Sequence, residues 1–334
     1  MTEVIRYEHV DISYKGKRVV HDVSFSVEKG EILGIVGESG SGKSTLIKAA
    51  MGLLGKDGLV TRGDIWYKGM DLPDLKPREM RKLCGPELGM IFQTAGSSFC
   101  PIRTVRAQLY EFTTEHKKIK ADVFENQAEE LLEKFGFEDP KRVLDSYPFE
   151  LSGGMCQRVI IAMAVCGHPK LIIADEPTTA LDVTVQAQVL ELLKDLQKKL
   201  NTAILLITHN LGVVWEMCDT VMVMYAGNTV EYADTKTLYQ EPLHPYTWGL
   251  LDSMPKLSSS AKEDLKTIPG TPPDLRLTGY CCNFYNRCPY ATEICKNQVP
   301  PLKEVAPGHF VACHRQDGEH RLTRGEVNET CRKM

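Results

Sequence analysis

The sequence predicts an α/β fold organised around a phosphate-binding loop, and three stretches support that prediction. The segment GESGSGKST, Gly37 to Thr45, follows the apolar run Ile32 to Val36, which is typical of a buried strand. Two more apolar runs, LIIAD from Leu171 and AILLI from Ala203, also predict buried strands followed by polar residues. Polar groups at the carboxyl ends of strands lie where open α/β sheets bind ligands.

The loop fits the pattern GxxxxGK[ST] at Gly37, Gly42, Lys43 and Ser44. Backbone N–H groups wrap a polyphosphate only where side chains are absent, which Gly37, Gly40 and Gly42 permit. The following STLIKAAMGLL predicts a helix that begins near Lys43 and points its positive end at the same anion. We expect Lys43 to reach the β- and γ-phosphates and Ser44 to help hold Mg²⁺. The alternative, a glycine-rich turn with a chance lysine, is disfavoured by the flanking strand and helix.

Composition limits the function classes. The 334 residues leave room for one large or two ordinary domains, and 43% hydrophobic with 25% charged residues is ordinary globular composition. A net charge of −4 offers no basic surface for nucleic acid. No apolar run approaches the ~18 residues of a membrane span, so we expect a soluble cytoplasmic chain. Eleven cysteines without a secretion signal indicate reduced thiols or metal ligands.

The first thirty residues alternate apolar and polar side chains, which predicts antiparallel strands with a turn at Lys15-Gly16-Lys17. Tyr14 lies just upstream of the phosphate loop. An aromatic ring there can stack on adenine, a contact worth roughly 1–3 kcal/mol in other systems. It can equally pack within the small sheet, and spacing alone leaves both interpretations open.

Between the loop and the second apolar run, three patterns stand out. Gly63 to Leu72 predicts another strand and turn, and Leu88 to Gln93 predicts a buried strand that ends in a glutamine. Ala121 to Phe137 has apolar residues at helical spacing and a Gly-Phe ending. Gln93 is at the ligand-binding end of its strand, which is a weak signal by itself.

Two carboxylates, Asp175 and Glu176, follow the apolar run from Leu171. We expect Asp175 to bind Mg²⁺, usually through water, and Glu176 to polarise the attacking water. A solvated turn is the alternative, which the upstream phosphate loop disfavours. After the helical VQAQVLELLKDLQKKL, the run from Ala203 ends at His209. A lone histidine is commonly a core residue, but this one follows a third strand, which favours a γ-phosphate contact.

The C-terminal part contains a predicted linker, Ser258 to Lys266, and four cysteines separated by five, six and seventeen residues, namely Cys282, Cys288, Cys295 and Cys313. So few apolar residues surround them that a metal centre would supply missing folding energy. Four thiolates suit a [4Fe–4S] cluster or Zn²⁺. The absence of paired CxxC knuckles favours the cluster over zinc, and free cysteines remain a third interpretation.

Together these residues resemble the ATP-binding subunits of ABC transporters from Val4 to Leu251. The decisive feature is LSGGM, Leu151 to Met155, between a Q-loop glutamine and a Walker B strand. The resemblance makes Tyr14 the A-loop aromatic, Glu176 the catalytic glutamate, Ala180-Leu181-Asp182 the D-loop and His209 the switch histidine. The implied ATP and Mg²⁺ ligands within the chain are Tyr14, Gly37, Ser39, Gly40, Gly42, Lys43, Ser44, Thr45, Gln93, Asp175, Glu176 and His209, with Ser44, Gln93 and Asp175 on Mg²⁺.

The resemblance also implies a RecA-like core, an antiparallel β subdomain and a helical signature subdomain at about 94–168, within an ATP-binding domain over 1–255. It implies a head-to-tail dimer, in which Ser152, Gly153 and Gly154 complete the phosphate cage of the partner's ATP. Two positions depart from the family pattern. Cys156 replaces a residue that is usually basic, and Thr94 replaces an aspartate, which leaves partner and permease contacts open.

Three further patterns, HPYTxxLL, IPGxxP and CxFxxRCPxAxxxC, resemble the C-terminal extension of oligopeptide and dipeptide importer ATPases. The resemblance implies a small irregular Cys-rich domain over 256–334 whose four cysteines bind a [4Fe–4S] cluster, with Cys282 rather than Cys281 as first ligand. It implies ATP-driven peptide import with a second ATPase subunit, expected as a heterodimer, two permeases and an extracellular solute-binding protein. The chain would then lie at the cytoplasmic face of the cell membrane. Alternatives are uptake of nickel or another metal chelate, and a soluble ABC protein outside transport.

Overall fold

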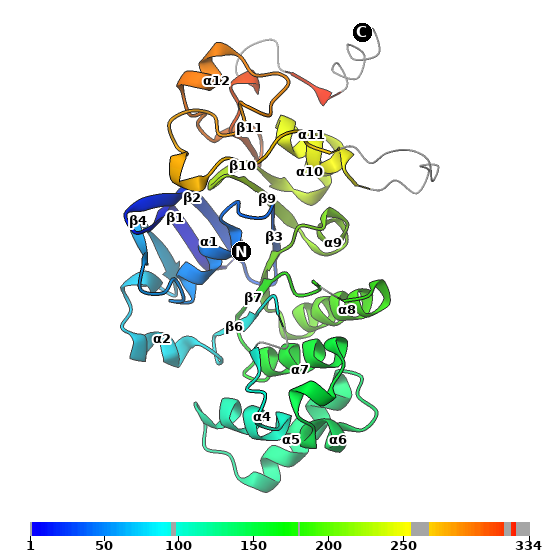
Figure 1. The fold of residues 1–334 in the computed structure, drawn as a ribbon. Helices are drawn as coiled ribbons and strands as arrows, with labels where there is room; N and C mark the ends of the chain where they lie inside the picture. Colours follow the sequence, from blue (N-terminus) through cyan, green and yellow to red (C-terminus); the bar gives the residue numbers. More distant parts are fainter. Residues whose placement is uncertain (1, 95–97, 180, 255–266, 317–321, 325–334) are drawn as a thin grey trace. The chain divides into compact units, whose positions relative to one another are not determined.

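The computed structural model describes residues 2–94, 98–179, 181–254, 267–316 and 322–324 (Figure 1). The chain divides into two compact units. The first unit comprises Met1–Ile5, Val27–Glu31 and Asp74–Ile207, and the second comprises Arg6–Ser26, Ile32–Pro73 and Thr208–Met334. The predicted linker from Ser258 to Lys266 lies outside the described residues.

The second unit contains a sheet with the strand order β11-β12-β10-β9-β3. Strand β3 (Ile32–Val36) is fully buried, as predicted, and runs parallel to β9 (Thr220–Tyr225). The other neighbours are antiparallel: β10 (Asn228–Asp234) pairs with β9 and with β12 (His309–Val311), which pairs with β11 (Lys303–Ala306). Since β11 and β12 come from the Cys-rich extension, that extension shares a sheet with β3, the strand that leads into the glycine-rich loop.

The helices of the second unit are short. The described ones are α1 (Lys43–Ala50), α9 (Leu211–Met217), α10 (Thr235–Gln240), α11 (Pro245–Asp252) and α12 (Glu293–Asn297), with single 3-10 turns at Leu275–Leu277 (η3) and His314–Gln316 (η4). A further 3-10 turn, η1 (Leu72–Asp74), ends on the first residue of the segment Asp74–Ile207 of the first unit. Helix α1 begins at the predicted residue, directly after the phosphate loop.

A second sheet has the order β2-β1-β4-β5. The predicted hairpin is confirmed, because β1 (Glu3–Tyr14) and β2 (Lys17–Glu28) are joined by a two-residue turn in which Lys15 and Gly16 both have positive φ. The predicted strand at Gly63 is also present, although β4 (Gly58–Tyr67) begins earlier and β5 spans Met70–Asp71.

The first unit contains three parallel strands in the order β8-β7-β6, namely β8 (Ala203–Ile207), β7 (Leu171–Asp175) and β6 (Leu88–Ile91). All residues of β7 and β8 are buried, which explains why their sequences are continuous apolar runs. The described helices of this unit are α2 (Pro77–Leu83), α4 (Val105–Thr114), α5 (Ala121–Lys134), α6 (Pro140–Asp145), α7 (Gly153–Val165) and α8 (Val183–Leu200), with a 3-10 turn η2 (Pro148–Glu150).

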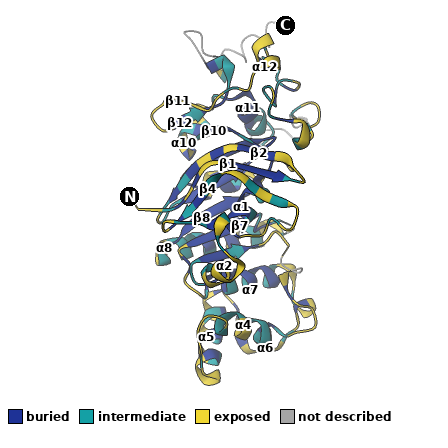
Figure 2. Ribbon diagram, turned by 90° about the vertical axis from the view of Figure 1, so that its left-hand side faces the viewer, coloured by how far each residue is buried: buried dark blue, intermediate teal, exposed yellow. Residues whose placement is uncertain are grey.

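Burial follows the amphipathic patterns of the sequence. Helix α5 buries Phe124, Ala128 and Leu132 at helical spacing and ends before Gly136, whose φ is 75°. Figure 2 shows the strands β7 and β8 as buried and much of α5 as exposed. None of the described helices combines the length and apolar character needed to cross a membrane.

The Cys-rich extension does bury some apolar side chains, but against the rest of the second unit. Phe284 is only 3% exposed and packs on Tyr225 and Tyr246, with ring centroids 5.1 and 5.4 Å apart. The sequence predicts too few apolar residues for an independent core, and in the structure Phe284 is buried against residues outside the extension. The missing partner surface comes from β9 and α11, which sequence spacing does not reveal.

Candidate active site

The phosphate loop leaves β3 at Gly37 and enters α1 at Lys43. Gly37, Gly40 and Gly42 have φ values of 152°, 78° and 98°, which favour glycine. A Cβ atom on Gly37 would lie 2.1 Å from the carbonyl oxygen of Met224, so a side chain cannot fit there without moving β9. The glycines therefore serve both the backbone conformation and the close approach of neighbouring strands.

Lys43 is held against the loop itself. Its side chain is buried, and Nζ donates to the carbonyls of Gly37 and Glu38, each at 2.8 Å, and to Ser41 Oγ at 3.2 Å. Ser44 and Thr45 occupy the first turn of α1, and Gly42 as N-cap offers no side chain to cover the N–H groups there. This arrangement directs an ammonium group and a helix N-terminus to one loop, which suits a polyphosphate.

The carboxylate pair lies in the first unit. Asp175 is the buried last residue of β7, and Glu176 follows with a φ of 47°. The Glu176 carboxylate accepts a hydrogen bond from Gln93 Nε2 at 2.9 Å and another from Thr179 Oγ1 at 2.8 Å. Two neutral donors thus fix the orientation of this carboxylate, and its left-handed backbone is the kind of local strain that clusters at functional sites.

The structure brings Gln93 to Glu176, as expected of residues that share a site. Thr179 was not identified from the sequence, although its place three residues after Glu176 offers a signal, since its N–H also donates to the Glu176 carbonyl at 3.1 Å. Thr94, the departure beside Gln93, is exposed, and its carbonyl accepts from Ser98 Oγ at 3.0 Å.

Three other predicted residues lie in the second unit. His209 is exposed and follows β8 by two residues, and Ser39 is exposed in the phosphate loop. Tyr14 ends β1 half-buried, and a Cβ on Gly58 would lie 2.8 Å from its ring, so the ring packs on the start of β4. That position is compatible with both interpretations of Tyr14.

The signature segment forms the N-terminus of α7. Ser152 is the N-cap, and its hydroxyl accepts from the Met155 N–H at 3.2 Å. Ser152 and Gly153 are exposed, whereas a Cβ on Gly154 would lie 2.7 Å from Val185 at the start of α8. Of the D-loop, Ala180 lies outside the described residues, and Asp182 caps α8 by accepting from the Val185 N–H at 3.0 Å.

Cys156, at a position where the family that the chain resembles usually has a basic residue, packs between α7 and the turn η2. Its side chain is buried, and Sγ donates to the Pro148 carbonyl at 3.3 Å, which holds the turn η2 against α7. Burial raises the pKa of this thiol. A basic side chain could not occupy the same buried position without moving η2.

The four extension cysteines lie within electrostatic range of one another. Burial, with smaller contributions from the neighbouring thiols, raises the pKa of Cys282 to about 12, of Cys288 to about 11 and of Cys313 to about 12. Cys295 is buried, and its N–H and carbonyl bond Thr292 and Cys282. The described cysteines form no disulfide, and among the described residues no group of three or more His, Cys, Asp or Glu side chains is arranged to hold a metal ion.

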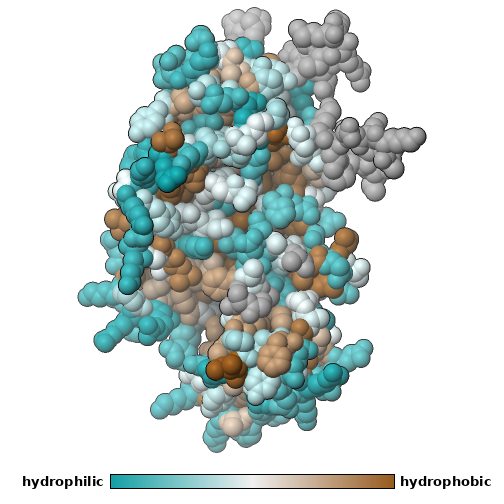
Figure 3. All heavy atoms as spheres, viewed as in Figure 1, coloured by the Kyte–Doolittle hydropathy of each residue, from teal (hydrophilic) through white to brown (hydrophobic). Residues whose placement is uncertain are grey.

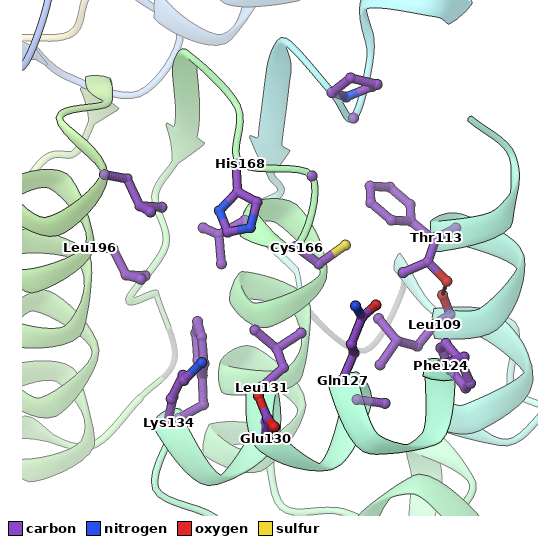
Figure 4. Close-up of a pocket in the computed structure, with 18 of the residues that line it drawn as sticks. Leu109, Thr113, Phe124, Gln127, Glu130, Leu131, Lys134, Cys166, His168 and Leu196 are labelled. Atoms are coloured by element: carbon purple, nitrogen blue, oxygen red, sulfur yellow. Dashed lines mark hydrogen bonds between the residues drawn. The ribbon is translucent and has the colours of Figure 1, made fainter. Parts of the chain in front are cut away.

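A cavity of about 790 Å³ lies among α4, α5, α7 and α8 of the first unit (Figure 4). Leu109, Phe124, Leu131 and Leu196 line it together with His168. None of the predicted nucleotide ligands lines this cavity. The candidate active site is therefore defined by the loop and strand-end residues and not by this cavity.

A glycine-rich phosphate loop, a carboxylate pair of which Glu176 is hydrogen-bonded by a glutamine, and an LSGG helix N-terminus define the class of ABC-type ATPases. The "ABC transporter" family matches residues 20–179, and the family "Oligopeptide/dipeptide transporter, C-terminal region" matches residues 230–295. Among solved structures, cbiO1 from Clostridium perfringens, part of the ABC transporter complex cbiONQ, gives a TM-score of 0.63 at 26% identity, covering 72% of this chain and 91% of its own. The dimeric bacterial cassette MJ0796 gives a TM-score of 0.62 at 26% identity, covering 70% of this chain and 99% of its own.

Curated relatives define the family more closely. The oligopeptide transport ATP-binding protein OppD of Bacillus subtilis (strain 168) is 48% identical over 93% of this chain and 88% of its own length. The dipeptide transport ATP-binding protein DppD of Escherichia coli (strain K12) is 45% identical over 89% of this chain and 90% of its own. The chain belongs to the ATP-binding proteins of oligopeptide and dipeptide ABC transporters, and it is an ATPase.

Proposed function

We propose that this chain hydrolyses ATP to drive import of oligopeptides or dipeptides. The observation that supports this most is the 48% identity with an oligopeptide transport ATP-binding protein over 93% of the chain. In this proposal the chain lies at the cytoplasmic face of the membrane and works with a second ATPase subunit and two permeases. An extracellular solute-binding protein delivers the peptide. Relatives named for both dipeptide and oligopeptide transport leave the preferred peptide length to experiment.

Each predicted residue has a role in the proposed mechanism. Lys43, with the N–H groups of the loop, binds the phosphates, and Tyr14 stacks on adenine. Ser44, Gln93 and Asp175 would hold Mg²⁺, which neutralises phosphate charge when bound. The other phosphate contacts come from Gly37, Ser39, Gly40, Gly42 and Thr45.

Glu176 is the proposed general base, and His209 contacts the γ-phosphate. The two hydrogen bonds from Gln93 and Thr179 support the role of Glu176, because they orient its carboxylate before ATP arrives. The exposure of Ser152 and Gly153 supports their proposed contact with the partner subunit's ATP. A helix N-terminus that faces solvent is accessible to the phosphates of an ATP molecule on another chain.

The test of the catalytic role compares Glu176→Gln with Glu191→Gln, an exposed glutamate on α8. Glu176→Gln should keep ATP binding and lower turnover by ~10²–10⁴-fold, because a positioned general base contributes about that factor. Glu191→Gln should leave both unchanged. Normal turnover in Glu176→Gln would contradict the assignment.

Exposed apolar side chains in the first unit support docking to permeases. Ile102 is 82% exposed and Phe149 is 73% exposed, and the Phe149 ring stacks on Tyr147. Figure 3 shows apolar side chains among polar ones on the face over the helices α4 to α7. Side chains of this kind suit protein contacts.

The transport proposal is tested on the whole complex, copurified through this chain and reconstituted in lipid with its binding protein. Stimulation of ATP hydrolysis by di- to octapeptides is the expected result, and the preferred length identifies the cargo class. Stimulation by nickel or nickel–histidine alone would move the chain to metal-chelate uptake. If the chain does not cofractionate with membranes and with its permeases, it would be an ATPase that acts outside transport.

For the extension, we propose that residues 256–334 form a Cys-rich domain beside an ATP-binding domain over 1–255, with a helical subdomain at about 94–168. Its cysteines Cys282, Cys288, Cys295 and Cys313 would hold a [4Fe–4S] cluster. The four thiols lie within electrostatic range of one another, which supports the proposal, although among the described residues no group of three or more metal-binding side chains is arranged around one metal ion. A tetrahedral Zn²⁺ needs all four sulfurs about 2.3 Å from one point, whereas cluster ligands bind different irons and lie further apart.

Anaerobic purification with iron and labile-sulfide analysis tests the cluster. Cys282→Ser should lose both, and Cys281→Ser, the matched neighbour, should retain both. Zinc without iron or sulfide in the wild-type chain would contradict the cluster and favour the tetrahedral site.

A further inference from the structure

Glu38, the second residue of the phosphate loop, joins that loop to the C-terminal extension. Its backbone N–H donates to Tyr246 Oη at 2.8 Å, and its carboxylate accepts from both terminal nitrogens of Arg287, at 2.6 and 2.9 Å. Tyr246 belongs to the HPY segment at the start of α11, and Arg287 precedes Cys288. Both contacts lie within the second unit.

Arg287 is fixed by more than this ion pair. Nη1 also donates to Tyr225 Oη at 3.2 Å, Nη2 to the Ile268 carbonyl at 3.1 Å and Nε to the Pro269 carbonyl at 2.9 Å. All five N–H groups of the guanidinium therefore have acceptors, and the side chain is only 4% exposed. The Glu38 carboxylate raises the pKa of Arg287 above its usual value, so the ion pair is present at any physiological pH.

The other polar group of Glu38 faces Lys43. The Glu38 carbonyl accepts from Lys43 Nζ at 2.8 Å and from the Ser41 N–H at 3.2 Å. Arg287, Glu38 and Lys43 thus form one continuous chain of hydrogen bonds. The carbonyl that holds the phosphate-binding lysine and the carboxylate that binds Arg287 therefore belong to the same loop residue.

The extension end of this chain of contacts is tied to the cysteines. The Arg287 N–H donates to the Phe284 carbonyl at 3.0 Å, and the Tyr285 N–H donates to the Cys282 carbonyl at 3.0 Å. Arg287 therefore sits in the short turn between Cys282 and Cys288. The backbone of this turn therefore carries both Arg287 and the two cysteines on either side of it.

We propose that Arg287 is a positioning residue for the phosphate loop, acting through Glu38, so that nucleotide affinity depends on the folded state of the Cys-rich extension. The proposal rests on the proposed nucleotide-binding role of the loop. Coupling between two sites is reciprocal, so bound nucleotide should also stabilise the extension.

The test measures equilibrium binding of a fluorescent ATP analogue to the full chain and to variants at both ends of the pair. Arg287→Met and Glu38→Gln should each weaken binding by about tenfold, within the usual range of coupled sites. Both substitutions remove the same ion pair, so their effects should not add. The double variant should therefore bind the ATP analogue about as tightly as the single variant with the lower affinity. Arg276→Met is the matched control, since Arg276 makes a similar pair with Asp274 in the extension but is 62% exposed and lies in η3.

Two further measurements separate positioning from general stability. In steady-state hydrolysis, Arg287→Met should raise the KM for ATP, while kcat at saturation stays within about twofold of wild type. Arg287→Lys keeps the charge but cannot bind both carboxylate oxygens in the same geometry, so its KM should lie between those of wild type and Arg287→Met. Lys43→Ala should lose nucleotide binding outright. Normal binding in Lys43→Ala would contradict the nucleotide site itself, separately from the coupling.

The coupling is refuted if Lys43→Ala loses binding while Arg287→Met and Arg276→Met bind ATP as tightly as wild type. It is equally refuted if the effects of Glu38→Gln and Arg287→Met are additive. Should Arg287→Met not fold, Glu38→Gln and Arg287→Lys decide the question, because Glu38 is partly exposed and its amide keeps the side-chain volume.

Discussion

His21 gives the sharpest quantitative prediction, because its titration reports how the extension covers β2. The His21 side chain is buried, and Nε2 bonds Thr278 Oγ1 at 2.9 Å. Nδ1 is buried without a hydrogen-bond partner among the described residues, so a proton there would be an unpaired buried donor. Burial, reinforced by the charge of Arg18 and opposed by Asp11, lowers the pKa of His21 from 6.5 to about 4.

The sign and size of the effect follow from proton linkage. The unfolded chain binds the His21 proton at a higher pH than the folded chain, so stability falls as the pH drops from about 6.5 towards 4. Between pH 7 and pH 5 the pKa difference corresponds to a loss of about 2 kcal/mol, and the full loss below pH 4 approaches about 3 kcal/mol.

Urea unfolding at pH 7 and pH 5 measures this loss. His21→Gln does not titrate in this range, so wild type should lose about 2 kcal/mol more than this variant between the two pH values. Equal pH dependence in wild type and His21→Gln would refute the burial of His21 under Thr278.

Three further predictions concern the loop, the junction with the extension and the carboxylate. Gly37→Ala should lower ATP affinity by at least about tenfold and destabilise the fold by about 1–3 kcal/mol, because its Cβ would meet the Met224 carbonyl oxygen. Gly40→Ala should have a smaller effect on affinity and on stability, because no described atom lies within 4 Å of its Cβ. Nucleotide titration measures the affinity, and thermal unfolding measures the stability. Glu231→Gln should lower the free energy of unfolding by about 3 kcal/mol, measured by urea unfolding. The Glu231 carboxylate is fully buried and accepts hydrogen bonds from the Leu243 and His244 N–H groups and from His309. Glu304→Gln, at an exposed position, should change the free energy of unfolding by no more than about 0.5 kcal/mol. Thr179→Val should lower kcat by about tenfold without changing ATP affinity, because it removes one of the hydrogen bonds that orient Glu176, and Thr179→Ser should restore turnover. Unchanged kcat in Thr179→Val would contradict a role of Thr179 in orienting Glu176.

Local pattern was sufficient to predict the strands that frame the site. The runs at Ile32, Leu171 and Ala203 are buried strands because fully buried strands are continuously apolar, and the helix at Lys43 begins where the glycine pattern ends. The sequence placed Gln93 and Glu176 each after a strand, and the structure adds that the two side chains are hydrogen-bonded at the ends of neighbouring parallel strands.

Long-range contacts were beyond the reach of such patterns. Glu38 and Arg287 are 249 positions apart, and no periodicity connects them. The pairing of β12 with β10 also joins distant segments, and its strand of three residues is too short to give a periodic signal. Cys156 shows the converse limit, because a family pattern predicts a basic residue where this chain buries a thiol under η2.

The extension motifs that first indicated the peptide-transporter family have a common physical meaning in this structure. His244 caps α11 by accepting from the Tyr246 N–H at 3.0 Å, which fixes the tyrosine whose hydroxyl bonds Glu38. The IPG segment supplies the carbonyls of Ile268 and Pro269 to the same guanidinium that binds Glu38. Three motifs that are separated along the chain therefore constrain one residue of the phosphate loop.

An extension that served only its own stability would not need to place a buried arginine on that residue, because replacing such an ion pair by apolar side chains is often neutral or stabilising. Retaining the pair is therefore better explained by the position it imposes on the loop.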